Sequence, residues 1–217
     1  MSDLPVSLSP ASSSILLGAL DQERKIERAL EALGPIAGRD LVLVGGGPLE
    51  IRRHAEAGAR VTAVESLLDD DAQALPDASA DVIVSAWSAF RDVAAEELAV
   101  ADRLLRAAGR LLVVHDYGRD DVSRLRGDLP EYGSWSRKNG PFLGNGFRVR
   151  VIHCFWTFDT IEATQSFLAD AFGEAGVTIG AELKRPRLSW NVAIYHRSRG
   201  GLTPAEADPD ETEGRTP

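Results

Sequence analysis

The sequence predicts one α/β domain built on a doubly wound, mainly parallel β-sheet. Two observations predict it. Short apolar runs rich in β-branched residues alternate with helical segments at the spacing of βαβ units. The run at 41–44 leads directly into three glycines, as expected of a strand that is buried on both faces and ends in a tight turn. With 217 residues, 44% of them hydrophobic, the chain has the size and composition of a single globular domain.

The elements of this sheet follow one another in a regular order. A helix is expected from the serines at 12–14 to residue 33, just before Gly34 and Pro35. Strands are then expected at 41–44, 60–65, 81–86 and 111–115. Helices are expected between them at 48–57 and 94–107. Right-handed crossovers between successive parallel strands fix most of the resulting topology.

Beyond residue 117 the pattern is less regular. Residues 127–146 are rich in glycine, proline, asparagine and aromatic residues, a composition typical of a lid or binding loop. Further elements are expected in the order strand, helix, strand, strand, at 147–156, 160–172, 177–183 and 190–195. The last two strands would close the sheet as a C-terminal antiparallel hairpin across Pro186.

The two ends of the chain differ in composition from this domain. Residues 1–13 hold serine and proline with little periodicity, and we expect a disordered N-terminus there. The segment 201–217 is acidic, rich in proline and threonine, and free of aromatic residues, which is typical of a disordered tail. The domain itself is expected to span residues 14–200.

The charge balance is acidic, with 24 Lys and Arg residues against 33 Asp and Glu residues and a formal net charge of −9. Such a surface repels phosphate backbones, which argues against a nucleic-acid partner. No apolar run approaches the ~20 residues that a membrane helix needs. The first residues also lack the basic-then-apolar pattern of a secretory signal. We therefore expect a cytoplasmic protein whose partner is a small molecule, and the oligomeric state stays open.

The chain has one cysteine, Cys154, which lies in an apolar run. A single cysteine excludes an internal disulfide and a cysteine-rich zinc site. We expect Cys154 to be a buried, unreactive side chain rather than a catalytic thiol.

The sharpest local pattern is a strand, the turn Gly45-Gly46-Gly47, a helix, and an acid, Glu65, at the end of the next strand. Glycines let a ligand approach the backbone closely, and a helix start presents unpaired N–H groups. In open parallel sheets ligands bind beyond the carboxyl ends of the strands, where a carboxylate can accept both hydroxyls of a ribose. The combination predicts a nucleoside pocket, and a tight turn without a ligand is the alternative explanation.

Three segments, in this order, resemble motifs of the class I S-adenosylmethionine-dependent methyltransferases. Leu-Val-Leu-Val-Gly-Gly-Gly-Pro at 41–48 looks like their first motif. The segment 75–85 is similar to their "LP, small loop, DV-x-V-S" stretch, and 104–114 is similar to their "LLRPGGRLLVV" stretch. The resemblance covers roughly residues 25–120 and implies a Rossmann-like, class I methyltransferase-like fold.

The resemblance also implies the cofactor S-adenosylmethionine and roles for individual residues. The backbone from Gly45 to Gly47 would face the methionine part of the cofactor, and Glu65 would hold the ribose hydroxyls. Three residues just past the third strand would lie where cofactor and substrate meet: Ser85, Ala86 and Trp87. Core packing is an equally good explanation for Trp87.

The sequence departs from the family pattern at three places. The usual acid of the first strand falls on Leu43, and the last glycine of the turn falls on Leu49. The stretch between Glu65 and Leu75 is too short for the usual helix and strand. Their absence would open one side of the adenine pocket, and the acid near the adenine amine would be Asp70 or Asp71.

Candidate catalytic residues lie at the end of the fourth strand. Methyl transfer needs positioning and, for poor nucleophiles, a general base. The candidates are His115, Asp116 and Tyr117. His153, in an apolar stretch, is more typical of a packed core histidine. Adjacent strand residues point to opposite faces and no third ligand is found, so no metal site is expected.

Three functional hypotheses follow. The first is S-adenosylmethionine-dependent methyl transfer to a small molecule. In it the aromatic loop from Tyr132 to Phe142, with Arg137, Lys138 and Arg148, would close over an aromatic or anionic acceptor.

The second hypothesis is a catalytically inactive methyltransferase-like domain used for binding or dimerisation, which the departures at Leu43 and Leu49 motivate. The third is a nicotinamide-dependent oxidoreductase. In that fingerprint the third glycine falls on Glu50, whose carboxylate would meet the pyrophosphate.

Overall fold

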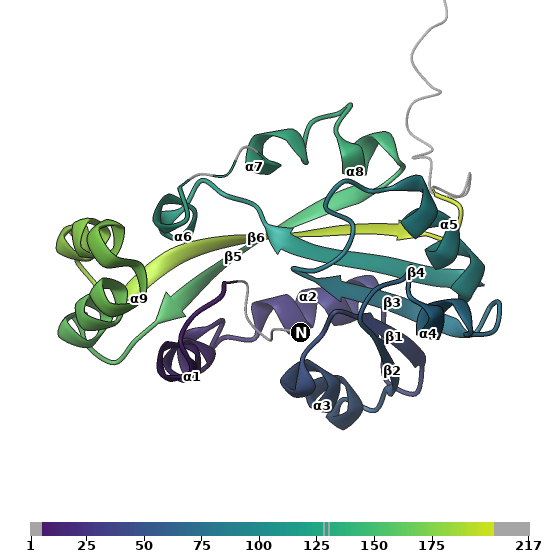
Figure 1. Ribbon diagram of the computed structural model, residues 1–217, viewed down its shortest axis with the longest axis horizontal. Coiled ribbons are helices and arrows are strands. Elements are labelled where there is room, and N and C mark those ends of the chain that lie inside the picture. Colours follow the sequence, from purple (N-terminus) through teal and green to yellow (C-terminus); the bar gives the residue numbers. More distant parts are fainter. Residues whose placement is uncertain (1–5, 128, 130, 202–217) are drawn as a thin grey trace, which may run out of the picture.

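The computed structural model describes residues 6–127, 129 and 131–201, which form one six-stranded sheet with helices on both faces (Figure 1). The strands lie in the order β2-β1-β3-β4-β6-β5. Strands β1 to β4 are parallel, and β6 runs antiparallel to both β4 and β5. The bounds are β1 Asp40–Val44, β2 Arg60–Val64, β3 Ala80–Ala86, β4 Leu105–Asp116, β5 Arg148–Thr157 and β6 Arg187–Ser198. The predicted doubly wound, mainly parallel α/β fold is confirmed.

Helices cover this sheet on two sides. Their bounds are α1 Pro10–Ala19, α2 Lys25–Leu33, α3 Pro48–Glu56, α4 Asp70–Gln73, α5 Ala95–Leu104, α6 Asp121–Leu125, α7 Glu131–Ser134, α8 Pro141–Gly144 and α9 Ile161–Glu182. In Figure 1, α1, α2 and α3 lie below the sheet, and α5, α7 and α8 lie above it. Within the described residues, no helix combines the length and the apolar composition needed to cross a membrane.

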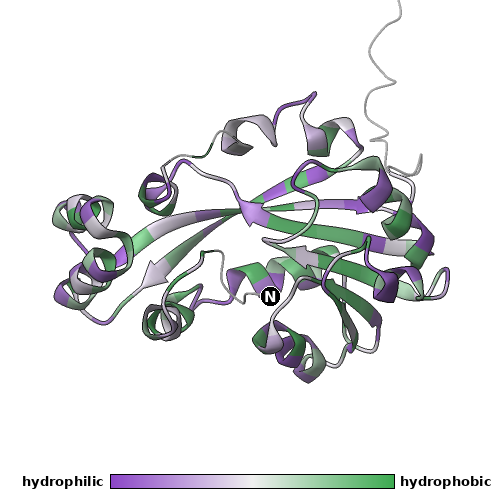
Figure 2. Ribbon diagram, in the orientation of Figure 1, coloured by the Kyte–Doolittle hydropathy of each residue, from purple (hydrophilic) through white to green (hydrophobic). Residues whose placement is uncertain are grey.

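The central strands contribute side chains to two separate cores, because successive side chains of a strand point to opposite faces of the sheet. Leu41 and Leu43 of β1 pack into the core beneath α1, α2 and α9, whereas Val42 and Val44 pack into the core beneath α5 and α8. Figure 2 shows hydrophobic residues concentrated along these strands and hydrophilic residues on the outer faces of the helices. This burial on both faces is the reason that β1 is apolar at every position after Asp40.

The first predicted helix is wrong as a single element. The structure has two helices, because the chain turns at Asp21, which has a positive φ of 38°. The Asp21 carboxylate accepts hydrogen bonds from the backbone N–H groups of Lys25 (3.0 Å) and Ile26 (2.8 Å) and so caps the start of α2. Helix α1 begins at Pro10, inside the segment expected to be disordered, and Ser9 caps it.

The predicted strand at 177–183 is also wrong. Residues 177–182 belong to α9, which reverses direction at Gly173 (φ 57°, ψ −132°) so that its two halves pack side by side. A side chain at Gly176 would lie 1.9 Å from the Leu168 carbonyl oxygen, so this close approach requires glycine. The antiparallel partner of β6 is therefore β5 rather than a hairpin strand. The acidic tail expected at 201–217 lies outside the described residues except for Gly201.

Helix α5 and strand β4 meet earlier than predicted. The helix ends at Leu104 and the strand begins at Leu105, whereas the sequence predicted helix to 107 and strand from 111. The pairing of β3 with β4 shifts register between Ala80 and Val82, which accommodates the extra residues around Gly109.

An ion-pair network holds the amino ends of the parallel strands together. The Asp40 carboxylate contacts Arg60 Nε (2.6 Å) and Arg106 (2.8 Å). Asp81 pairs with Arg106 (2.8 Å) and accepts a hydrogen bond from the Asp40 backbone N–H (2.9 Å). Hydrogen bonds from Arg60 and Arg106 lower the pKa of Asp40 to about 2.

We expect Asp40 to make stability depend on pH at the acidic end of the scale. Because the pKa of Asp40 is lower in the folded protein (about 2) than its ordinary value of 3.8, the carboxylate stabilises the fold above pH 4. This contribution is lost as the pH falls toward 2. The difference in melting temperature between the wild type and Asp40→Asn should therefore shrink from pH 5 to pH 2.5. Asp77→Asn, which removes an exposed pair with Arg103, is the control. A gap for Asp40→Asn that stays constant with pH would contradict the prediction.

Candidate functional site

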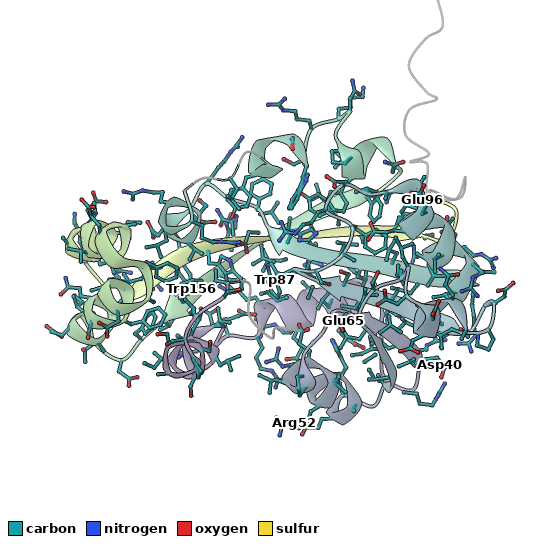
Figure 3. The ribbon with its side chains drawn as sticks, viewed as in Figure 1. Asp40, Arg52, Glu65, Trp87, Glu96 and Trp156 are labelled. Carbon is teal, nitrogen blue, oxygen red and sulfur yellow. The ribbon has the colours of Figure 1, made fainter. Side chains whose placement is uncertain are left out.

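The strand register brings the predicted site residues to one edge of the sheet. Val44 of β1 pairs with Val64 of β2 and with Ser85 of β3. The residues that follow, Gly45, Glu65 and Ala86, therefore lie in adjacent positions at the carboxyl ends of three neighbouring strands. In Figure 3, Glu65 and Trp87 lie near the middle of the molecule, and Asp40 marks the opposite end of the sheet.

The glycine turn is closely packed by the protein's own side chains. Gly45 has a φ of +70°, and a Cβ atom there would lie 2.4 Å from Ser88 Cβ. A Cβ atom on Gly46 would lie 2.4 Å from Leu43 Cδ2. Leu43 is fully buried and fills the position of the family's acid with an apolar side chain. Glycine at 45 and 46 is thus required by packing, whether or not a ligand binds.

The loop after β3 folds back over this turn. Ser88 Oγ donates to the Val44 carbonyl oxygen (2.8 Å) and lies 3.0 Å from Ser85 Oγ. The buried Ser85 hydroxyl also accepts a hydrogen bond from the backbone N–H of Ala89 (3.1 Å). The buried Ser85 side chain therefore holds the loop after β3 in place through these two contacts. Trp87, Phe90 and Val93 all have positive φ values of 53°, 62° and 49°. Such conformations are costly for bulky and β-branched residues, so the loop is held under strain.

Glu65 directly follows the edge strand β2 and is exposed. Its carboxylate makes no hydrogen bond or ion pair with another described residue. The stretch from 66 to 79 contains the one-turn helix α4 and no strand, which confirms the predicted shortening after Glu65. The side of the sheet next to Glu65 is consequently open.

A cavity of about 840 Å³ lies between α2 and α3, against the faces of β3 and β4. Its floor is apolar and includes Val84, Ala86, Val114 and Trp190. Leu49 and Glu50 line it at the start of α3. Its volume suits a small organic molecule. Of the predicted cofactor residues, Ala86 and Trp87 line this cavity, whereas Ser85, Glu65 and the three glycines of the turn do not.

Solved protein structures resemble this arrangement, although no family model and no curated protein sequence matches the chain. A candidate type II methyltransferase from Anaeromyxobacter dehalogenans aligns over 82% of this chain and 97% of that chain, with 18% identity and a TM-score of 0.53. The chain has the methyltransferase fold.

Two further solved structures resemble the chain less. A candidate methyltransferase of an antibiotic biosynthesis pathway from Anabaena variabilis has a TM-score of 0.47 and 16% identity, over 78% of this chain and 95% of that chain. Geranyl diphosphate C-methyltransferase from Streptomyces coelicolor, solved with S-adenosyl-L-homocysteine, has a TM-score of 0.41 and 15% identity, over 82% and 80% of the two chains.

Two tryptophans form one wall of the cavity in this methyltransferase fold. The indoles of Trp87 and Trp190 stack with ring centroids 5.7 Å apart. Both Nε1–H groups donate to Asp116 Oδ1, at 3.1 and 3.0 Å. The other oxygen, Oδ2, binds Arg126 and lies 3.5 Å from the Tyr132 hydroxyl. Asp116 therefore fixes the orientation of both rings.

This arrangement bears on the three predicted catalytic residues. The oxygens of Asp116 are occupied by donors, which suits a positioning residue better than a general base. His115 is buried on the opposite face of the sheet, against Trp135 (4.7 Å) and Phe142 (6.0 Å). Burial lowers the pKa of His115 to about 3, so its imidazole is neutral. Tyr117 is half-buried on the same side as His115, and its backbone N–H donates to Asn191 O (2.8 Å). The catalytic roles stay predictions.

The expected aromatic lid is part of the core instead. Trp135 and Phe142 are buried, and Phe142 stacks on Tyr195 with ring centroids 3.8 Å apart, on the side of the sheet opposite the cavity. None of the predicted lid residues, Tyr132, Arg137, Lys138 and Arg148 included, lines the cavity. Trp135 and Phe142 cannot close over a molecule in this cavity, because the sheet lies between them and it. Tyr132 differs, since its hydroxyl lies 3.5 Å from Asp116 Oδ2.

The predictions for other polar residues have mixed outcomes. Cys154 is buried as expected, and burial raises its pKa to about 12. His153 is exposed, and its Nδ1 lies 2.7 Å from Asn191 Oδ1, so the core assignment is wrong. Among the described residues, no three His, Cys, Asp or Glu side chains are placed to hold a metal ion.

The sequence analysis missed two residues of the cavity. One is Trp190, which lies beside Trp87, and the other is His54. His54 lies on the buried side of α3, three positions after Ile51, and is 7% exposed. A histidine on the apolar face of a short helix is a signal that could have been read. The pairing of Trp87 with Trp190 could not, because it joins residues a hundred positions apart.

Replacing Asp116 with asparagine is expected to loosen the tryptophan wall. Arg126, whose side chain is 18% exposed, would lose its counter-charge in a largely buried position. We expect the free energy of unfolding to fall by about 3 kcal/mol. The tryptophan emission should shift to longer wavelength as the indoles gain contact with water. Denaturant titration and fluorescence measure the two effects.

Glu182→Gln is the matched control, because it removes the exposed pair between Glu182 and Arg124 (2.9 Å). Its cost should stay below about 1 kcal/mol, and its emission spectrum should not change. Equal losses of stability in the two variants would show that Asp116 does not organise this wall.

Proposed function

We propose that the protein is an S-adenosylmethionine-dependent methyltransferase that acts on a small molecule. The observation that carries the proposal is the row formed by Gly45, Glu65 and Ala86 at the carboxyl ends of adjacent parallel strands. Neighbouring strands lie about 4.8 Å apart, so a nucleoside held by the end of β2 would reach across the turn after β1 to the end of β3. The methyltransferase fold of the chain supports this assignment.

The residues fit the nucleoside part of this cofactor. Glu65 is exposed at the end of β2 and has both carboxylate oxygens available for ribose hydroxyls. The residues around the methionine part fit less completely, since the buried Leu43 offers no carboxylate to an ammonium group. When bound, the cofactor would supply a methyl group activated by a sulfonium. Ala86 and Trp87 would then separate the nucleoside from the acceptor in the cavity.

The positions of His115 and Asp116 bear on which residue could act as a general base for the acceptor. His115 is neutral and faces the opposite side of the sheet, and the oxygens of Asp116 already accept hydrogen bonds from two indoles and Arg126. Neither is placed to remove a proton from a molecule in the cavity. An acceptor that needs a general base would have to use another ionisable residue of the cavity lining, such as Glu50 beside the glycine turn. Neither a nucleic acid nor a membrane is part of the proposal.

A second candidate function is a catalytically inactive binding domain with the same fold. Ser88 over Gly45 and Leu43 beneath Gly46 favour it, because both side chains pack tightly around the turn that a cofactor would use. The nicotinamide alternative ranks third. Glu50 Oε2 would lie 3.0 Å from a Cβ atom on Gly46, so a carboxylate stands where a pyrophosphate would approach the helix.

Calorimetric titration separates these candidates. We expect S-adenosylmethionine and S-adenosylhomocysteine to bind with micromolar Kd values. Glu65→Ala should weaken both by about tenfold or more, because it removes two hydrogen bonds to a charged acceptor. Glu96→Ala, an exposed acid on α5 that Figure 3 shows far from Glu65, is the matched control and should bind like the wild type.

Each other result points to a different function. Binding of NAD alone would favour the oxidoreductase. Binding of a sulfur nucleoside with no methyl transfer to any acceptor would favour the inactive domain. If neither S-adenosylmethionine, S-adenosylhomocysteine nor NAD binds, the methyltransferase proposal is wrong.

A further inference from the structure

His54 is a buried polar side chain with no partner of its own. It is 7% exposed and lines the cavity between α2 and α3. Its imidazole makes no hydrogen bond with any other described residue, although buried polar groups in proteins are nearly always hydrogen-bonded. The described side-chain atoms that are fully buried without a partner do not include the His54 nitrogens, so these nitrogens are open to the cavity, where water or a ligand can bind them.

His54 and the tryptophan wall lie at opposite ends of this cavity. Trp87 follows β3 at the carboxyl edge of the sheet, next to the glycine turn. His54 lies seven residues after Gly47 along α3, so it is about 10 Å further from that edge at 1.5 Å per residue. The floor between the two ends is apolar, formed by Val84, Val114 and Leu30. The cavity therefore extends along α3 over an apolar floor, and charged side chains of α2 and α3, such as Glu31 and Arg52, surround it.

The electrostatics at the far end favour a neutral group. Burial lowers the pKa of His54, so the imidazole is uncharged near neutral pH and offers one N–H donor and one acceptor nitrogen. The charges that act on it have opposite signs, Arg53 on its own helix and Glu27 on α2. A hydroxyl, which both donates and accepts, matches this environment better than a carboxylate or a phosphate.

We propose that the space between α2 and α3 holds the acceptor, that the acceptor is an elongated and mainly apolar molecule, and that His54 binds a neutral hydroxyl at its far end. The acceptor role rests on the proposed methyltransferase function. The end to be methylated would lie beside Trp87, and His54 would act as a specificity-determining residue that sets how far the molecule enters.

The test uses decanol as a probe and does not need the cofactor. Trp87 and Trp190 line the cavity, so binding should change the tryptophan fluorescence of the full chain in a saturable way. We expect decanol to bind with a micromolar Kd, and decanoate to bind at least threefold more weakly. His54→Leu should weaken decanol binding about tenfold by removing the hydrogen bond. His54→Gln, which still donates and accepts, should stay within about threefold of the wild type.

His153→Leu is the matched control, because it removes an exposed histidine on β5 that does not line the cavity, and its affinity should not change. Circular dichroism checks that each variant is folded. If His54→Leu fails to fold, the His54→Gln variant and the comparison of decanol with decanoate carry the test. Tighter binding of decanoate, equal affinity of the wild type and a folded His54→Leu, or no saturable response to decanol would each overturn the proposal.

The two proposals fail in different ways. A response to decanol that depends on His54, without binding of S-adenosylmethionine, would remove the methyltransferase function and leave a ligand cavity. Binding of S-adenosylmethionine without any response to decanol would remove this inference alone. If both ligands bind, each should leave the affinity of the other within about threefold, and direct competition would overturn the placement of the acceptor beside the nucleoside.

Discussion

The parallel register of β1 with its two neighbours is the constraint on which the candidate site depends. Val44 pairs with both Val64 and Ser85, so the residues that follow on the three strands lie side by side at one edge of the sheet. The network of Asp40, Arg60 and Arg106 at the other end of these strands supports the same register. A shift of one residue would turn Leu43 and Val44 to the wrong cores and separate Gly45 from Glu65. Sheet pairing therefore positions the site before any ligand takes part.

Packing around the turn then decides what that edge can bind. Leu43 replaces a carboxylate with an apolar side chain that belongs to the core beneath α1 and α2. Ser88 ties the strained loop after β3 to the Val44 carbonyl oxygen, which places Trp87 where Asp116 can hold its indole. The same loop thus closes one side of the glycine turn and builds one wall of the cavity. The two halves of the candidate site are not independent, since a change in the loop would move both.

The sequence predicted the parallel core because local signals and the final packing agree there. Continuous apolar runs such as 41–44 fit a strand covered on both faces, and the glycines mark its end. The failures occur where tertiary contacts override local pattern. The break at Asp21 depends on a carboxylate capping two N–H groups, and the helix at 177–182 depends on the contact of Gly176 with Leu168. Neither contact has a periodic signal. Aromatic content alone likewise could not tell that Trp135 and Phe142 lie on the far side of the sheet.

The cavity between α2 and α3 is the feature on which the choice of acceptor depends. A space of about 840 Å³ lies there against β3 and β4. It opens to solvent between exposed side chains of α2 and α3, among them Arg28, Glu31 and Arg53, so it is a surface groove rather than an empty void in the core. Larger side chains at Ala86 on the floor or Ala32 on α2 would reduce it. The chain instead has small residues there and a buried histidine without a protein partner. A ligand that fills this groove and hydrogen-bonds His54 would use both features at once.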